Sequence, residues 1–116
     1  MNEHRRNQRK RAPRAIPVTD TITGQPIGHI GNLSTDGMLL ISSRRLGEDA
    51  LFQFSFDLPA SRVQSTRPIQ VGVHEQWAEP ANVPGQFWSG FRIIDISPAD
   101  FDVLNNWIAS PGGQIV

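Results

Sequence analysis

Arginine is concentrated at the start of the chain, and its side chain is well suited to binding phosphate. Residues 1–14 carry six basic side chains and one acidic side chain, hence a net charge of +5, and five of the six are arginine. The remaining residues hold five basic and ten acidic side chains. A guanidinium donates paired hydrogen bonds to phosphate and stacks on a base, whereas lysine is a point charge. The segment is predicted to bind phosphate or nucleic acid, with a disordered basic tail as the open alternative.

A second group of polar residues lies in the segment Asn32-Leu33-Ser34-Thr35-Asp36-Gly37. In an extended segment the side chains of Asn32 and Ser34 point to the same face, where they would offer small hydrogen-bonding groups. Gly37 permits a tight turn. Such a face would read the polar edge of a purine, although ordinary turn chemistry accounts for the same residues.

The elements that position these groups are mostly strands. Alternating or β-rich segments predict strands at 15–23, 27–33, 38–42, 51–58, 69–77 and 87–94. In the fifth, Trp77 is expected to share a face with the buried valines, interrupted by Glu75. Gly90 in the sixth indicates a bulge or a close backbone approach.

One helix is predicted over about 97–109. Ser97 is a suitable N-cap and Pro98 suits the first helical position. Phe101, Leu104 and Ile108 follow helical spacing and predict a buried face that covers one opening of a barrel.

Composition argues against several classes of function. The 116 residues suit one domain, and the sequence has no cysteine and no apolar run of the roughly 20 residues that a membrane span needs. The N-terminus does not resemble a secretory signal, so a cytoplasmic protein is expected. The three histidines lack metal-ligand spacing, and no pair of acids suggests general acid–base work. We therefore predict no enzyme, no metal site and no cofactor.

In the order and spacing of these motifs, the chain resembles the PilZ domain family. That family has an Arg-x-x-x-Arg motif before its first strand and an Asp/Asn-x-Ser-x-x-Gly motif about twenty residues later. Residues 32–37 fit the second motif completely, and the apolar continuation 38–41 and the segment 90–94 before a helix also resemble the family. The resemblance covers nearly the whole chain.

The resemblance implies a six-stranded antiparallel β-barrel with a C-terminal α-helix, and a receptor for cyclic di-GMP. The predicted division is a flexible basic arm at 1–14, a barrel with its helix at 15–110, and a tail at 111–116. The arm would order over the barrel when the ligand binds and so change contacts with a protein partner in motility, pilus or exopolysaccharide machinery. The residues expected to bind the ligand are Arg9, Lys10, Arg11, Arg14, Asn32, Ser34, Gly37 and Trp77.

The first motif departs from the family pattern. If Arg14 directly precedes the first strand, Lys10 stands where the family has arginine, and a literal Arg-x-x-x-Arg exists only at Arg5 and Arg9. Lysine keeps the charge but not the planar fork. Trp77 is expected either in the core or at the ligand. Two other functions stay open: a PilZ-like interaction module without nucleotide, and a nucleic-acid binder that uses the basic arm.

Overall fold

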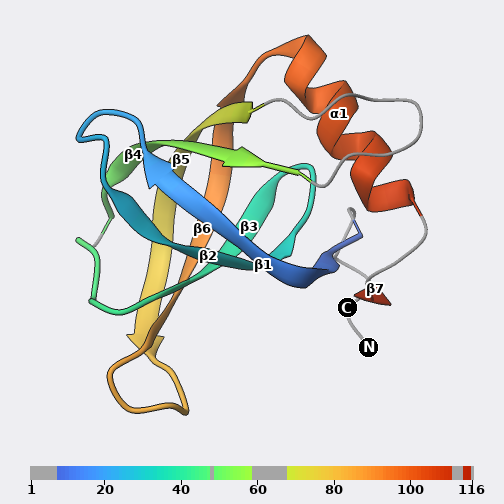
Figure 1. The fold of residues 1–116 in the computed structure, drawn as a ribbon. Helices are drawn as coiled ribbons and strands as arrows, with labels where there is room; N and C mark the ends of the chain where they lie inside the picture. Colours follow the sequence, from blue (N-terminus) through green and yellow to red (C-terminus); the bar gives the residue numbers. More distant parts are fainter. Residues whose placement is uncertain (1–7, 48, 59–67, 111–113, 116) are drawn as a thin grey trace.

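The computed structural model describes residues 8–47, 49–58, 68–110 and 114–115 of the chain (Figure 1). The elements within these ranges are β1 (Lys10–Asp20), β2 (Pro26–Leu33), β3 (Gly37–Ser42), β4 (Leu51–Asp57), β5 (Pro68–Pro80), β6 (Phe87–Ile96), α1 (Pro98–Ala109) and β7 (Gln114–Ile115).

Six strands close into an antiparallel barrel. Their order is β2-β3-β6-β5-β4-β1, and β1 pairs back to β2 to complete the ring. The two-residue strand β7 adds to the start of β1, opposite Lys10 and Arg11. A mostly-β fold with a closed six-stranded barrel and one C-terminal helix confirms the predicted fold class.

The barrel interior is filled by the apolar faces of the alternating strands. In β4, Phe54 and Phe56 are buried while Gln53 and Asp57 are exposed, which is the period-2 pattern expected of a strand with one face inside. The ring of Phe54 meets that of Phe91 edge to face, with ring centroids 5.1 Å apart. Burial of such rings away from water is the main favourable contribution to folding.

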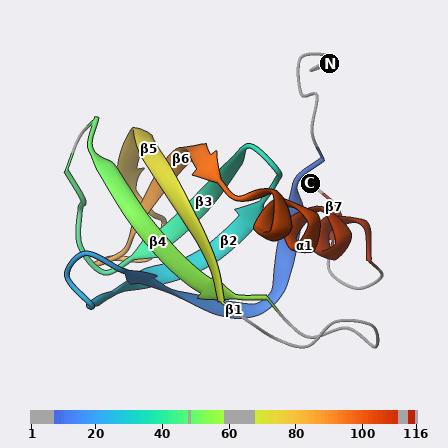
Figure 2. The same ribbon diagram turned by 90° about the horizontal axis from the view of Figure 1, so that it is seen from above.

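The helix lies against one end of the barrel (Figure 2). Ser97 caps it by accepting a hydrogen bond from the backbone N–H of Asp100 at 3.1 Å. Leu104, Trp107 and Ile108 join the barrel core. The predicted place of Phe101 on that face is wrong, because Asp100 occupies the inward position of the first turn, and Phe101 is 39% exposed.

Strand β1 begins at Lys10, five residues before the predicted strand. Lys10 and Arg11 pair with Leu33 and Asn32, then the register shifts before Ile16 pairs with Ile30. The intervening residues 12–15 form a bulge opposite a single residue of β2. The part of the predicted arm at 1–7 lies outside the described residues, while 10–14 belong to the barrel wall.

Strand β5 corrects a second expectation. Glu75 does not interrupt the buried face, because its side chain is itself buried at 1% exposure. A register shift between Glu75 and Trp77 then turns the tryptophan outward, where it is 46% exposed. Trp77 is therefore on the barrel surface and not in the core.

Candidate functional site

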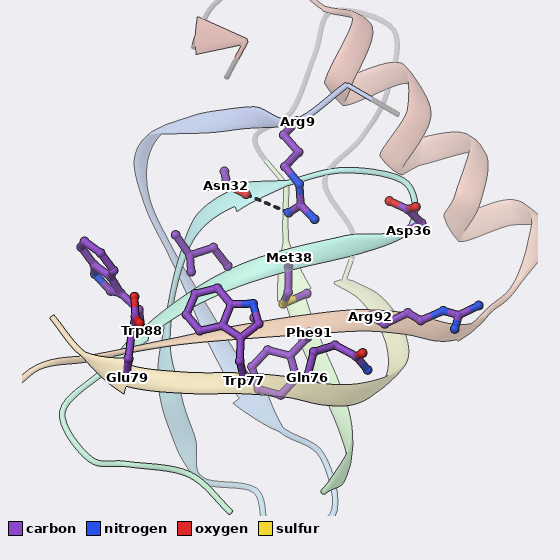
Figure 3. A pocket seen from close by; sticks show the side chains of 12 residues that line it. Arg9, Asn32, Asp36, Met38, Gln76, Trp77, Glu79, Trp88, Phe91 and Arg92 are labelled. Carbon is purple, nitrogen blue, oxygen red and sulfur yellow. Dashed lines mark hydrogen bonds between the residues drawn. The ribbon is translucent and has the colours of Figure 1, made fainter. Parts of the chain in front are cut away.

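A pocket of about 600 Å³ lies on the outer face of the barrel, over β3, β5 and β6 (Figure 3). Its volume is within the range of about 300–1,000 Å³ that small-molecule sites span. The lining combines two arginines and two carboxylates with two indoles and two amides, and consists of Arg9, Asn32, Asp36, Met38, Leu39, Gln76, Trp77, Glu79, Trp88, Gly90, Phe91 and Arg92.

Arg9 extends over the pocket from the residue directly before β1. Its Nη1 donates a hydrogen bond to Oδ1 of Asn32 at 3.1 Å (Figure 3). Gly37 makes room for this guanidinium, because a Cβ at that position would lie 3.1 Å from Nη2 of Arg9 and 2.9 Å from the carbonyl oxygen of Phe91. The absence of a side chain at Gly37 thus lets the arginine lie across β3.

Trp77 forms the opposite wall of the pocket and lies flat on the neighbouring strand. It pairs with Gly90 of β6, and a Cβ on Gly90 would stand 2.3 Å from Nε1 of the indole. Gly90 was expected to mark a bulge or a close backbone approach, and the group that lies close to it is the side chain of Trp77. The half-exposed indole presents an aromatic face of the kind on which a base can stack.

The turn between β2 and β3 places its polar residues in two different environments. Asn32 is half-buried and faces the pocket. Ser34 is fully buried, and its hydroxyl donates to Oδ1 of Asp36 at 2.7 Å and accepts from the N–H of that residue at 3.3 Å. The predicted guanine contact of Ser34 stays a prediction, while the bonds seen here hold the turn that carries Asn32.

Lys10 points away from the pocket, toward the end of α1. Its Nζ donates to the carbonyl oxygens of Trp107 at 2.8 Å and Ser110 at 2.9 Å, and to the Ser110 hydroxyl at 3.1 Å. It also lies 4.6 Å from the centroid of the Trp107 ring, within cation–π range. Because its side chain is only 2% exposed, loss of hydration lowers the pKa of Lys10.

These bonds give Lys10 a structural task. The last carbonyls of a helix have no partner inside the helix. The last turn of α1 contains no basic residue of its own. Lys10, which is far from the helix in sequence, supplies these donors. The lysine at the position where an arginine was expected therefore holds the end of the helix.

The predicted residues are thus only partly brought together. Arg9, Asn32 and Trp77 line one pocket, and Gly37 lies beneath Arg9. Arg11 and Arg14 line a neighbouring pocket with Asn32. Lys10 and Ser34 line neither.

Sequence reasoning missed six polar or aromatic members of the site, which are Asp36, Gln76, Glu79, Trp88, Phe91 and Arg92. The signal for two of them was the hairpin between the fifth and sixth strands. In its register Trp77 pairs with Gly90 and Glu79 with Trp88, which brings both indoles and a carboxylate to one sheet region. Reading that register required the bulge at Gln76, which periodicity alone does not reveal.

The described residues contain no group of three or more potential metal-ligating side chains. None of the helical structure in the described ranges is long and apolar enough to cross a membrane.

Comparison with known proteins identifies the family of the chain and structures with a similar fold. The structure is similar to the inhibitor of motility MotI/DgrA of Bacillus subtilis, with a TM-score of 0.74, 14% identity, and coverage of 91% of this chain and 49% of that one. It is also similar to the PilZ domain of YcgR from Escherichia coli solved with c-di-GMP, with a TM-score of 0.69, 18% identity, and coverage of 91% and 89%. The chain spans about half the length of MotI/DgrA.

A search of curated proteins found no match. The family pattern described as the PilZ domain matches residues 3–110, which is nearly the whole sequence and includes the barrel, the helix and the Arg9–Asn32 contact. The chain belongs to the PilZ domain family.

Proposed function

We propose that this PilZ domain is a receptor for cyclic di-GMP that binds the nucleotide in the pocket between Arg9 and Trp77. The observation that carries the proposal is the pairing of a guanidinium with Asn32 on one side of the pocket and an open indole face on the other. A guanidinium suits a phosphate, an indole suits a purine ring, and an amide suits the purine edge. The ligand found with the YcgR domain has all three parts of this chemistry to offer.

The structure alters which arginine pair the proposal uses. Because β1 begins at Lys10, the residue directly before the strand is Arg9, and the literal Arg-x-x-x-Arg spacing ends there. Arg5 lies outside the described residues. Lys10 is left to the helix, so the lysine in the place expected for arginine does not weaken the proposed motif.

The signal that follows binding is proposed to pass through the N-terminal segment. Ligand contact with Arg9 would replace its bond to Asn32, which would alter the surface that this part of the barrel offers to a protein partner. The similarity to an inhibitor of motility favours a partner in motility machinery. A cytoplasmic location and the absence of an enzymatic role stay predictions.

Isothermal titration with cyclic di-GMP tests the proposal. Arg9→Ala and Asn32→Ala should each weaken binding by about ten- to a hundredfold, because each removes a hydrogen bond worth about 1.5–3 kcal/mol when one partner is charged. Arg9→Lys should also weaken binding, since lysine lacks the planar fork. Arg44→Ala is the matched control, because Arg44 is exposed and lines neither pocket.

Wild-type protein that gives neither heat nor stabilisation at high micromolar nucleotide would overturn the proposal. Partner capture that proceeds equally with and without nucleotide would then favour an interaction module. Binding of DNA or RNA that falls steeply with salt would favour the nucleic-acid alternative.

A further inference from the structure

Gln76 lines the proposed nucleotide pocket beside Trp77, and its exposed amide is bonded to another residue of the same strand (Figure 3). Its Nε2 donates to Nδ1 of His74 at 2.8 Å and to the backbone carbonyl oxygen of the same residue at 3.3 Å. An amide nitrogen carries two hydrogens, so both donors of Gln76 are used on His74. The amide oxygen Oε1 is left as the group that Gln76 offers to a ligand.

These bonds define which nitrogen of the His74 ring carries the proton. The amide nitrogen of Gln76 can only donate, so Nδ1 of His74 is the acceptor and has no proton. The proton of the neutral ring is therefore on Nε2, which donates to Oδ1 of Asp49. The carboxylate thus orients the imidazole, and the imidazole orients the amide that lines the pocket.

The charged residues beside His74 belong to the segment before β4, to β5 and to β6, and are Asp49, Glu75, Arg92 and Asp95. Glu75 is buried in the barrel, whereas Arg92 lies opposite His74 in the register of β5 and β6. The residue opposite His74 on β4 is the apolar Leu51. Because Nε2 faces the Asp49 carboxylate, it keeps its proton in both charge states of the ring. Protonation of His74 therefore changes the Nδ1 side alone.

Protonation of His74 reverses what Gln76 can offer to a ligand. Histidine is the side chain whose charge changes near neutral pH. A proton on Nδ1 turns this atom from an acceptor into a donor, which cannot face the amide nitrogen. Rotation of the amide lets Oε1 accept from Nδ1–H, and the NH2 group then turns to the pocket. The Watson–Crick edge of guanine carries N–H donors at N1 and N2, which pair with an oxygen but not with an NH2 group.

We infer that Gln76 is a guanine-reading residue of the pocket, and that the charge state of His74 sets whether it offers an acceptor or a donor to the base. The inference rests on the proposed function and adds a specificity-determining residue to it. Gln76 touches the base, while His74 and Asp49 are positioning residues that act through its amide. Cyclic di-GMP is therefore bound more tightly when His74 is neutral.

Calorimetric titration with cyclic di-GMP at about pH 8 and about pH 5.5, on either side of the usual histidine range, tests the inference. Gln76→Leu should weaken binding about tenfold at the higher pH, because an N–H donor of guanine loses its acceptor. The wild type should lose its advantage over this variant at the lower pH, so that the two affinities converge. Gln76→Leu keeps the imidazole, so the attraction of its added charge for phosphate is common to both proteins.

Gln70→Leu is the matched control for this titration. It makes the same chemical change at an exposed position of the same strand, and Gln70 lines neither pocket. Its affinity should follow that of the wild type at both pH values.

Nitrogen-15 NMR of the imidazole provides a readout that needs no ligand. At about pH 8 the proton of His74 should be on Nε2, with Nδ1 unprotonated. A proton on Nδ1 at this pH, equal affinity of wild type and Gln76→Leu, or a constant ratio of their affinities at the two pH values would overturn the inference while the proposed function stands. A wild type that does not bind cyclic di-GMP at either pH overturns the proposed function itself, together with the role of Gln76 that rests on it.

Discussion

At the scale of single residues, the pocket depends as much on two missing side chains as on those present. Gly37 leaves space for the guanidinium of Arg9, and Gly90 leaves space for the indole of Trp77. Each glycine lies on a strand beside the functional residue it accommodates, and neither is required by a left-handed backbone, since the positive-φ glycines are Gly24, Gly28 and Gly85. Their role is therefore to permit close approach.

Gly90→Ala should weaken cyclic di-GMP binding by about tenfold or more. The new methyl group would lie 2.3 Å from Nε1 of Trp77, so the indole must leave the strand surface. Titration gives the affinity, and the Trp77 indole resonance reports the displacement. Gly47→Ala is the control, because its Cβ would meet only Ala50 at an ordinary 3.6 Å. Equal affinity and an unmoved indole signal in Gly90→Ala would contradict this account.

The chemistry-bearing residue types were readable from the sequence, but their groupings were not. Arginine in the N-terminal segment and Asn32 were expected from what guanidinium and amide groups can bind, whereas Trp77 was expected only from the resemblance to the PilZ family. The role of Lys10 could not be predicted, because its partner Trp107 is 97 positions away in the chain. The different environments of Asn32 and Ser34 depend on the bend into the turn, which a strict extended alternation does not describe.

At the scale of elements, alternation predicted β2 to β6 closely and missed the start of β1. Residues 10–14 are basic and contain Pro13, so they show no apolar period. They are nevertheless held in the wall by pairing with β2 and β7 and by the buried Lys10. The two-residue strand β7 could not be predicted either, because two residues show no alternation. It is defined by its pairing with β1.

The link between β1 and α1 makes a prediction about pH. Lys10 is the only lysine, and the sequence has no tyrosine or cysteine. Between about pH 9 and 11 it is therefore the only side chain expected to titrate. Its folded pKa is lowered from the model-compound value of 10.5, so the unfolded state binds more protons between the two pKa values. The free energy of unfolding should rise with pH through this interval and level off above it.

Urea denaturation at a series of pH values measures this slope. Lys10→Met keeps an unbranched side chain of similar length and removes the titrating group. The free energy of unfolding of this variant should therefore not change with pH over the same interval. The difference in the free energy of unfolding between the two proteins at each pH gives the contribution of Lys10, because any other effect of alkaline pH acts on both. A wild-type stability that falls with pH while the variant is flat would show that the ammonium is favoured in the folded state, contrary to this prediction.

At the scale of the whole molecule, the proposed ligand lies against strands that are distant in sequence. The first pocket takes residues from the segment before β1, from β2 and β3, and from the β5–β6 hairpin. A ligand that contacts all of these stabilises the closed barrel as a unit, because binding to the folded state alone adds to the free energy of unfolding.

Cyclic di-GMP at a hundred times its Kd should add about 2.7 kcal/mol of stability. For a domain of this size the unfolding midpoint should rise by roughly 10 °C. Differential scanning calorimetry measures the shift, and Arg9→Ala at the same nucleotide concentration should lose most of it. An unchanged midpoint at nucleotide concentrations that saturate binding in the titration would contradict binding across the barrel strands.

The burial of Lys10 also protects its side-chain amine from reagents that acylate amines. The chain has one side-chain amine, and the fold closes it between β1 and the last turn of α1. Such a reagent reaches the Lys10 amine only when the helix end separates from the strand. The rate at which an acyl group is added to Lys10, followed by mass spectrometry, thus measures how often that junction opens, without any engineered probe.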